Sequence, residues 1–419
     1  MLSKTRLYIF LFMIFQSLNI TSVFSQDYPY DLPFYNFIRY DENKLIFPGD
    51  SSSYDNLFSS FSTLTLKGEG RITVLHLGDS HIQADYFSGR VRERLQTFSP
   101  GNVGGRGFVF PYRVAQTNNP FNLANQYSGE WEYCRNVERN KDCDLGLSGI
   151  SVTTYDSTAT ISLYLKDKDY QKYDFNTVKI FHNFDSTSYT VELNGYLKKV
   201  EVSDNDSLGF TQFYLEDYTD TLHLRFVKNA PSQQKFTLHG ISLETEDPGV
   251  VYHSIGVNGA DVASFLRCTY FSQHLKALNP DWVIISLGTN DSYGKSIDSA
   301  ATYHDFERMV LKVRGVSPEI PILLTTPGDH YRQRRYVNRN TEVVRNIIID
   351  VAKKHDCAVW DYFSVMGGLN SVNFWYKAGL TANDKLHYSK DGYYLQGDLL
   401  FTAFLRAYDN YIDKNIINK

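Results

Sequence analysis

The feature that most constrains the fold of this chain is a recurring order of apolar runs, polar turns and helical spacing. Strand-length apolar runs lie at residues 72–77, 282–287, 320–326 and 358–363. Apolar residues at helical spacing cover residues 86–97, 343–354 and 392–411. Strands that alternate with helices imply a parallel sheet with helices on both faces. The sequence therefore predicts an α/β domain.

The pattern changes between residues 122 and 247. Apolar or alternating segments of strand length follow one another there, separated by Asp, Asn, Ser and Gly turns, and no helical period interrupts them. We expect an all-β sandwich of the jelly-roll kind over residues 122–247, inserted into an α/β domain made of residues 68–121 and 248–419. Residues 26–67 are aromatic and irregular, which predicts an arm packed on the surface.

The first 25 residues differ from all that follow. Lys4 and Arg6 make a basic start, and an apolar run covers residues 7–15. This order is typical of a secretory signal peptide, here residues 1–25. The alternative is an uncleaved membrane anchor, but the apolar run is shorter than the ~20 residues that a spanning helix needs. We therefore expect an exported protein, periplasmic or secreted, without stable membrane insertion.

Charge and cysteine usage limit the partners and cofactors. The net charge of -5 argues against nucleic acid as a partner, because that partner requires a clustered positive field. Cys134 and Cys143 lie close together in a polar stretch, and we expect them to pair, since export permits disulfides. Cys268 and Cys357 are expected to be buried free thiols. No CxxC or HExxH spacing occurs, and we expect neither a metal nor an organic cofactor.

Ser80 follows the first apolar run directly, within the turn GDSH at residues 78–81. Ligands bind at the carboxyl ends of strands in an open α/β sheet, so a serine there is a candidate nucleophile. Its proton needs a base, and the base needs an orienting partner. Asp384 and His387 are three residues apart, which can place both side chains on one turn. A helix cap and a surface Asp–His pair are the structural alternatives.

The oxyanion that forms after nucleophilic attack needs hydrogen-bond donors. The glycine-containing segment 254–260 can bring backbone N–H groups close to a substrate, because glycine has no Cβ. Asn290, just after the apolar run at 282–287, can add a side-chain amide. Each of these has a plain structural alternative, a turn glycine or a helix cap. Their joint presence at strand ends favours the catalytic interpretation.

Four short blocks of this chain resemble those of the SGNH/GDSL hydrolases. They are GDSH at 78–81, GVNGA at 256–260, GTND at 288–291 and DKLH at 384–387. The resemblance covers roughly residues 72–119 and 250–411 and implies a three-layer α/β/α sandwich. By position it implies Ser80 as nucleophile, His387 as base and Asp384 as the partner that orients the base.

The same resemblance implies an oxyanion hole made of the Ser80 N–H, the Gly259 N–H and the Asn290 side chain, with Gly256 as an alternative to Gly259. His81 stands where the GDSL form has leucine, and we expect it to line the pocket rather than to act as the base. Residues 104–108 are rich in glycine, and we expect a loop beside the active site there.

The β insertion is not part of the minimal SGNH fold. Exported SGNH proteins with such an insertion are similar to bacterial peptidoglycan O-acetylesterases, in which the inserted module is similar to a carbohydrate-binding module. The resemblance implies a serine esterase that removes O-acetyl groups from a polysaccharide, either peptidoglycan or another cell-envelope or dietary glycan, through an acyl-Ser80 intermediate. An O-acetyltransferase that uses the same acyl-enzyme and a non-catalytic glycan-binding protein are the alternatives.

Overall fold

The centre of the α/β part is a sheet whose strands follow the order β1–β19–β16–β15–β2–β14. In this computed structural model, which describes residues 32–166, 172–196, 198 and 200–417, neighbouring strands are parallel except for β1, which pairs antiparallel with β19. The strands are β1 (Leu45–Ile46), β2 (Arg71–Gly78), β14 (Gly249–Gly256), β15 (Trp282–Ser286), β16 (Ile322–Thr325) and β19 (Ala358–Trp360). The expected signal peptide, residues 1–25, lies outside the described residues.

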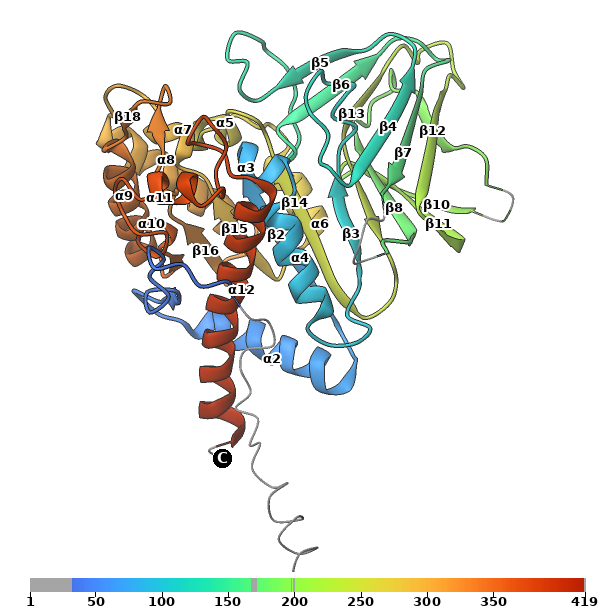
Figure 1. Cartoon of the computed structure of the whole chain (residues 1–419). Helices are drawn as coiled ribbons and strands as arrows, with labels where there is room; N and C mark the ends of the chain where they lie inside the picture. The colour runs from blue at the N-terminus through green and yellow to red at the C-terminus, as the bar shows by residue number, and fades with distance from the viewer. Residues whose placement is uncertain (1–31, 167–171, 197, 199, 418–419) are drawn as a thin grey trace, which may run out of the picture. The chain divides into compact units, whose positions relative to one another are not determined.

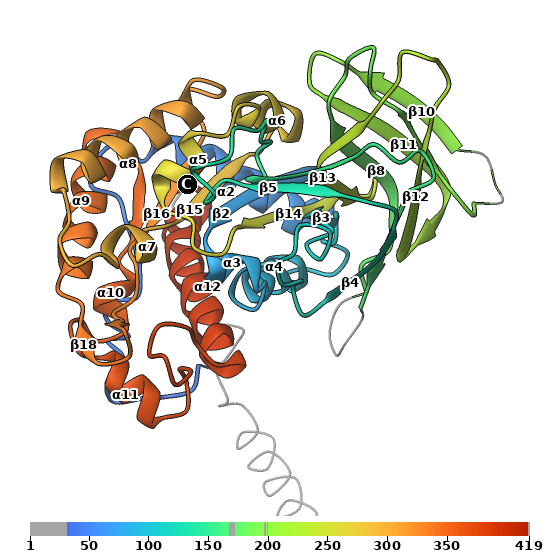
Figure 2. The ribbon, with the colours of Figure 1, turned by 90° about the horizontal axis from the view of Figure 1, so that it is seen from above.

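Helices cover both faces of this sheet, which confirms the predicted α/β fold (Figures 1 and 2). One face carries α4 (Phe87–Thr97) and α12 (Lys390–Ile412), which pack against each other. The other carries α5 (Val262–Leu266), α6 (Phe271–Leu278), α8 (Ser299–Arg314) and α9 (Asn340–Lys354). The remaining short elements are α3 (Ser80–Gln83), α7 (Thr289–Ser292), α10 (Tyr362–Val365), α11 (Val372–Lys377), β17 (Tyr331–Arg332), β18 (Tyr336–Val337) and a π-helical turn (Asp413–Ile417).

The prediction of an irregular arm before the first strand is wrong for much of its length. Residues Ser52–Lys67 form helix α2, which packs against α12 and β2. Tyr54, Phe58 and Phe61 recur at helical spacing and are all buried, so the aromatic residues that suggested irregularity are the apolar face of a helix. Earlier in the same segment, β1 extends the central sheet by pairing with β19.

The strands between β2 and β14 form two antiparallel sheets, shown in green at the upper right of Figure 1. One follows the order β10–β11–β8–β13–β6–β5, with β3 also paired to β13, and the other follows β4–β7–β12–β9. The strands are β3 (Gly105–Val109), β4 (Leu123–Ser128), β5 (Glu132–Arg135), β6 (Ile150–Thr154), β7 (Thr160–Leu165), β8 (Phe175–His182), β9 (Thr190–Leu193), β10 (Val200–Asn205), β11 (Phe210–Thr219), β12 (Thr221–Val227) and β13 (Phe236–Glu244).

Strand β3 corrects the expectation of an active-site loop at residues 104–108. These residues form a buried strand that pairs with β13 and lies close to β14. A Cβ at Gly107 would come within 2.4 Å of the Tyr252 carbonyl oxygen in β14. The glycines therefore allow a strand to pass close to a neighbouring backbone, a role that looks the same in sequence as a flexible loop.

A single apolar core runs through the α/β part and the β-rich part. Leu75 of β2, Phe108 of β3 and Val178 of β8 belong to one continuous cluster of buried side chains. The elements from Phe34 onward accordingly form one compact unit. None of the helices within the described residues is both long and apolar enough to cross a membrane.

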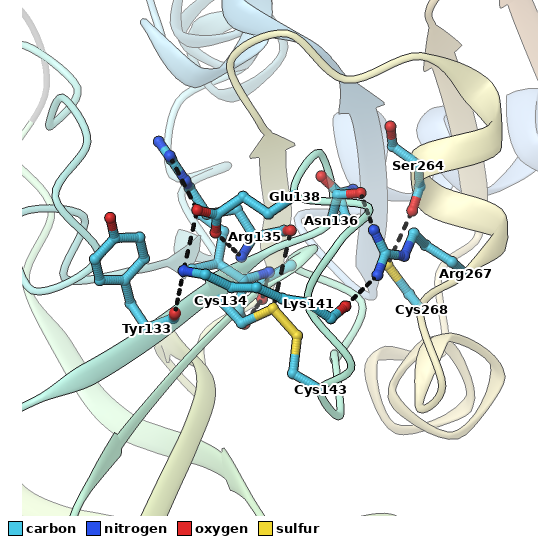
Figure 3. Close-up of a disulfide and its surroundings, with 12 residues drawn as sticks. Tyr133, Cys134, Arg135, Asn136, Glu138, Lys141, Cys143, Ser264, Arg267 and Cys268 are labelled. Carbon is cyan, nitrogen blue, oxygen red and sulfur yellow. Dashed lines mark hydrogen bonds and ion pairs between the residues drawn. A yellow bond between two sulfur atoms is a disulfide. The ribbon is translucent and has the colours of Figure 1, made fainter.

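The disulfide between Cys134 and Cys143 closes the loop between β5 and β6, as predicted. Figure 3 shows that this loop lies beside helix α5 of the α/β part. Arg267, at the end of α5, donates hydrogen bonds to the carbonyl oxygens of Asn136 (3.2 Å) and Lys141 (2.7 Å). The remaining cysteines, Cys268 and Cys357, are buried free thiols, which confirms the second cysteine prediction.

Candidate active site

The site lies where three neighbouring strands of the central sheet end. Strand β2 ends at Gly78, and Asp79 then caps the short helix α3 by accepting a hydrogen bond from the His81 N–H (2.9 Å). This cap fixes Ser80 at the first position of α3. Strands β14 and β15 pair with β2 on its two sides. The loop after β14 carries Gly259 and the short helix α7 after β15 carries Asn290, so the carboxyl edge of the sheet brings these residues together.

Ser80, His387 and Asp384 form a continuous chain of hydrogen bonds. The Ser80 Oγ lies 2.9 Å from the His387 Nε2, and the His387 Nδ1 lies 2.8 Å from the Asp384 Oδ2. The other carboxylate oxygen of Asp384 accepts the backbone N–H groups of Leu386 and His387, each at 3.0 Å. Backbone N–H groups of the loop before α12 therefore hold one oxygen of the Asp384 carboxylate, and the other oxygen orients the His387 imidazole.

The charges of this pair reinforce each other. The hydrogen bond from His387 to Asp384 raises the pKa of the imidazole above its ordinary value, and this effect outweighs burial. Partial burial alone would raise the pKa of Asp384, but the hydrogen bonds from the His387 ring and from two backbone N–H groups hold that pKa well below its usual range. Asp384 is thus ionised at neutral pH and stabilises a proton on His387.

The two glycines proposed as oxyanion donors occupy different places. Gly259 has a φ of 82° and lines the cleft in front of Ser80. Gly256 ends β14 beneath α3, where a Cβ would come within 2.2 Å of the Gln83 nitrogen. Within the described residues, the N–H groups of Ser80 and Gly259 make no hydrogen bond to the protein. These two donors are therefore available to a substrate.

Asn290 lines the same cleft, but its amide hydrogens are engaged. The Nδ2 donates to the Asp79 Oδ2 (3.1 Å) and to the Ala260 carbonyl oxygen (2.9 Å). Burial raises the pKa of Asp79 to about 6. Asn290 can donate a hydrogen bond to an oxyanion only if one of these two bonds breaks or if one N–H bonds both its present acceptor and the substrate.

His81 lies next to His387 and does not contact the nucleophile. Its Nδ1 is 2.9 Å from the Tyr393 hydroxyl oxygen, and its ring centroid is 5.3 Å from that of His387. Burial lowers its pKa well below the ordinary value, so the ring is neutral. No hydrogen bond joins His81 to Ser80 among the described residues. His81 does not line the cleft in front of Ser80; it lines a neighbouring cavity with Tyr362 and Tyr388.

A cleft of about 660 Å³ opens above Ser80. Sequence reasoning missed part of its wall, because nothing in the spacing of Gln83 indicates what that side chain binds. The Gln83 amide donates to the carbonyl oxygen of Asn118 (2.8 Å) and accepts the N–H of Asn258 (2.7 Å), which ties two cleft loops to α3. The residues lining the cleft are Ser80, Gln83, Ala84, Tyr86, Asn118, Asn119, Phe121, Asn258, Gly259, Thr289, Asn290, Leu386, His387 and Tyr393.

Part of this chain is similar to a known protein family. Residues 232–395 match the model of the GDSL-like Lipase/Acylhydrolase family. The matched segment contains Gly259, Asn290, Asp384 and His387, whereas Ser80 precedes it. No curated protein matches the chain in sequence.

Among solved structures, that of a peptidoglycan O-acetylesterase is similar over 87% of this chain and 99% of its own, with a TM-score of 0.71 and 23% identity. At this identity the likeness shows a common fold. Two smaller matches are a lipase/acylhydrolase from Enterococcus faecalis and an acetyl xylan esterase. They cover 39% and 37% of this chain and 78% and 81% of their own, at 23% and 19% identity, each with a TM-score of 0.31.

The described residues contain no group of three or more His, Cys, Asp or Glu side chains placed to hold a metal ion. That the reaction needs no metal or organic cofactor stays a prediction.

Proposed function

We propose that this protein is a serine esterase that removes O-acetyl groups from a polysaccharide, either peptidoglycan or another cell-envelope or dietary glycan. The observation that carries the proposal is the hydrogen-bonded chain from Ser80 through His387 to Asp384 at the base of an open cleft. The acylhydrolase family match supports ester chemistry. The fold shared with a peptidoglycan O-acetylesterase supports a glycan ester as the substrate.

The reaction uses one nucleophile and one base in two half-reactions. His387 Nε2 takes the Ser80 proton while the Ser80 Oγ attacks the acetyl carbonyl carbon. The bond from that carbon to the sugar oxygen breaks, and His387 returns the proton to the sugar as its hydroxyl group. Water then attacks acetyl-Ser80 with the same base, which releases acetate and restores Ser80.

The developing negative charge on the acetyl oxygen needs stabilisation in both half-reactions. The unbonded N–H groups of Ser80 and Gly259 supply two donors. The Asn290 amide supplies the third donor. It does so when its N–H bonds the substrate oxygen, either in place of the Ala260 carbonyl oxygen or in addition to it. Such a donor strengthens as charge develops, so it acts mainly on the transition state.

We also propose that the protein acts outside the cytoplasm, in the periplasm or as a secreted enzyme. The amino-acid pattern of residues 1–25 supports export, and a disulfide within the described part is compatible with an oxidising compartment.

Acetate release from O-acetylated peptidoglycan and from acetylated xylan tests the proposal, with the Ser80→Ala variant as the blank. We expect release that depends on Ser80. Acetyl transfer to an added glycan acceptor in place of acetate release would identify an O-acetyltransferase. Glycan binding without any loss of acetyl groups would identify a glycan-binding protein and overturn the esterase proposal.

A further inference from the structure

Three aromatic rings are stacked along one wall of the cleft. The Tyr86 ring is nearly parallel to that of Phe121, at 3° with centroids 4.4 Å apart, and to that of Tyr393, at 12° and 6.1 Å. All three side chains line the cleft. Among the described residues Phe121 makes a ring contact with Tyr86 alone, so its second face is not covered by another ring. Phe121 is partly exposed and lines the cleft, so its ring can contact a flat apolar ligand there.

Buried polar contacts hold this wall in place. Asp85, immediately before Tyr86, accepts a hydrogen bond of 2.8 Å from Asn122, immediately after Phe121. The same carboxylate is buried between the guanidinium groups of Arg92 and Arg106, each with an ion-pair distance of 2.7 Å. The bond between Asp85 and Asn122 therefore fixes the two neighbouring rings against each other. A preorganised wall loses little freedom when a ligand binds.

The chemistry of the cleft lining selects among ligand classes. None of its described lining residues is Lys, Arg, Asp or Glu, so apart from His387 the cleft offers no counter-ion to a phosphate or a carboxylate. Carboxamide groups of Asn118, Asn119 and Asn258 accompany the Phe121 ring. A long acyl chain would leave these carboxamide groups without hydrogen-bond partners. A ring with an apolar C–H face and hydroxyl or amide groups around its edge, which is a neutral pyranose, satisfies both kinds of surface.

We propose that the Phe121 ring, on the wall of the cleft, is a sugar-stacking subsite that holds a neutral pyranose unit of the substrate while its acetyl ester reaches Ser80. Phe121 is then a specificity-determining residue for glycan esters. The inference rests on the proposed function, because it presumes that the ester is carried by a glycan.

The test compares two kinds of ester in the full-length protein. The glycan probes are muramidase-released fragments of O-acetylated peptidoglycan and acetylated xylo-oligosaccharides. The small probe is triacetin, which has no ring, whereas an aryl acetate would itself stack on Phe121. The variants are Phe121→Ala, Phe121→Leu, which keeps an apolar side chain but not a flat one, and Phe121→Tyr, which keeps the ring. Phe34→Ala is the matched control, since Phe34 is 81% exposed and does not line the cleft.

We expect Phe121→Ala and Phe121→Leu to lower the ratio of kcat/KM for the preferred glycan to kcat/KM for triacetin about tenfold, mainly through KM, as loss of one stacking contact predicts. Phe121→Tyr should keep the wild-type ratio because it keeps the ring, and Phe34→Ala should leave the ratio unchanged. Circular dichroism establishes that each variant folds, and the leucine and tyrosine variants provide the comparison should the alanine variant fail to fold.

A ratio within twofold of wild type in Phe121→Leu would overturn the subsite, as would equal losses on glycan and triacetin. Failure of the proposed function has a different signature. The wild-type protein would then hydrolyse triacetin but release no acetate from either glycan. This result would contradict both the proposed function and the sugar-stacking subsite.

Discussion

One proton determines whether Ser80 can react, because only neutral His387 can accept it. The hydrogen bond to Asp384 raises the pKa of His387, so the imidazole keeps its proton to a higher pH than a free histidine, whose ordinary value is ~6.5. We expect kcat/KM for triacetin to rise with pH through a midpoint above that value. Asp384→Asn should lower both the rate and the midpoint, because the charge that favours the protonated ring is removed. A pH–rate profile of the two proteins checks this, and an unshifted midpoint would contradict it.

Ser80 and His387 act on the same proton, which has a kinetic consequence. Ser80→Ala and His387→Ala should each abolish ester hydrolysis while leaving the circular dichroism spectrum unchanged. The double variant should be no worse than either single variant, because removal of one member already disables the other. Additive losses in kcat, or near-normal turnover by Ser80→Ala, would show that the two residues are not one catalytic unit.

Asn290 is expected to act in the transition state. Asn290→Ala should lower kcat by on the order of 10²- to 10³-fold with little change in KM, as for the loss of one oxyanion donor. Steady-state kinetics on triacetin measures both constants. If only KM rises, Asn290 binds the ground-state substrate instead, or its bonds to Asp79 and Ala260 serve structure alone.

At the scale of elements, the sequence predicted the parts whose pattern is local. Strands β2 and β15 and helices α4, α9 and α12 lie where the apolar periods put them. The Ser80, His387 and Asp384 side chains lie together, as the resemblance to the SGNH/GDSL hydrolases implied. Their catalytic roles stay predictions until variants are measured.

The elements that were missed depend on distant partners. Helix α2 was missed although Tyr54, Phe58 and Phe61 have helical spacing, because the Ser- and Thr-rich segment around them reads as irregular and Ser51 makes no side-chain cap. Strand β3 was hidden by glycines that are needed because β14 passes close by. The cleft wall depends on a hydrogen bond between Asp85 and Asn122, residues far apart in the chain, which no local pattern indicates.

That wall depends on a buried charge, so its stability is measurable. Burial alone would raise the pKa of Asp85, but Arg106 and Arg92 hold it well below its usual range. Asp85→Ala leaves two buried guanidinium groups without their partner and should lower the free energy of unfolding by about 3–5 kcal/mol. Urea denaturation at neutral pH measures the loss. The exposed pair of Asp305 and Arg308 is the control, and Asp305→Ala should cost no more than about 1 kcal/mol.

The same charge gives a pH dependence. The pKa of Asp85 is lower in the folded protein than in the unfolded chain, where it is ~3.9. The Asp85 carboxylate therefore contributes its full stabilisation above about pH 4. This stabilisation declines as the pH falls toward the folded-state pKa. The difference in stability between wild type and Asp85→Ala should therefore narrow below about pH 4. A difference that stays constant down to pH 3 would contradict the ion-pair explanation.

At the scale of the whole molecule, the β-rich region is continuous with the α/β part. The apolar core passes from one to the other, and Arg139 of the disulfide loop pairs with Asp261, which caps α5 just after Gly259. The region proposed as an accessory glycan-binding insertion thus also contacts the loop that carries Gly259, the proposed oxyanion donor.

This continuity predicts a single unfolding transition. In a Trp131→Phe variant, which removes the tryptophan of the β-rich region, the fluorescence of Trp282, Trp360 and Trp375 reports on the α/β part, whereas far-UV circular dichroism also follows the β-rich sheets. The two signals should change together in urea, with coincident midpoints. Two separated transitions would show that the β-rich region unfolds independently of the α/β part.

The bond between Ser80 and His387 joins residues 307 positions apart. A ribosome adds roughly 5–20 residues per second, so the nucleophile leaves it at least about 15 s before the base exists. During that interval the chain carries a serine that cannot attack an ester. Under the proposed mechanism, ester hydrolysis can therefore begin only after the last part of the chain has been made and His387 has packed beside Ser80.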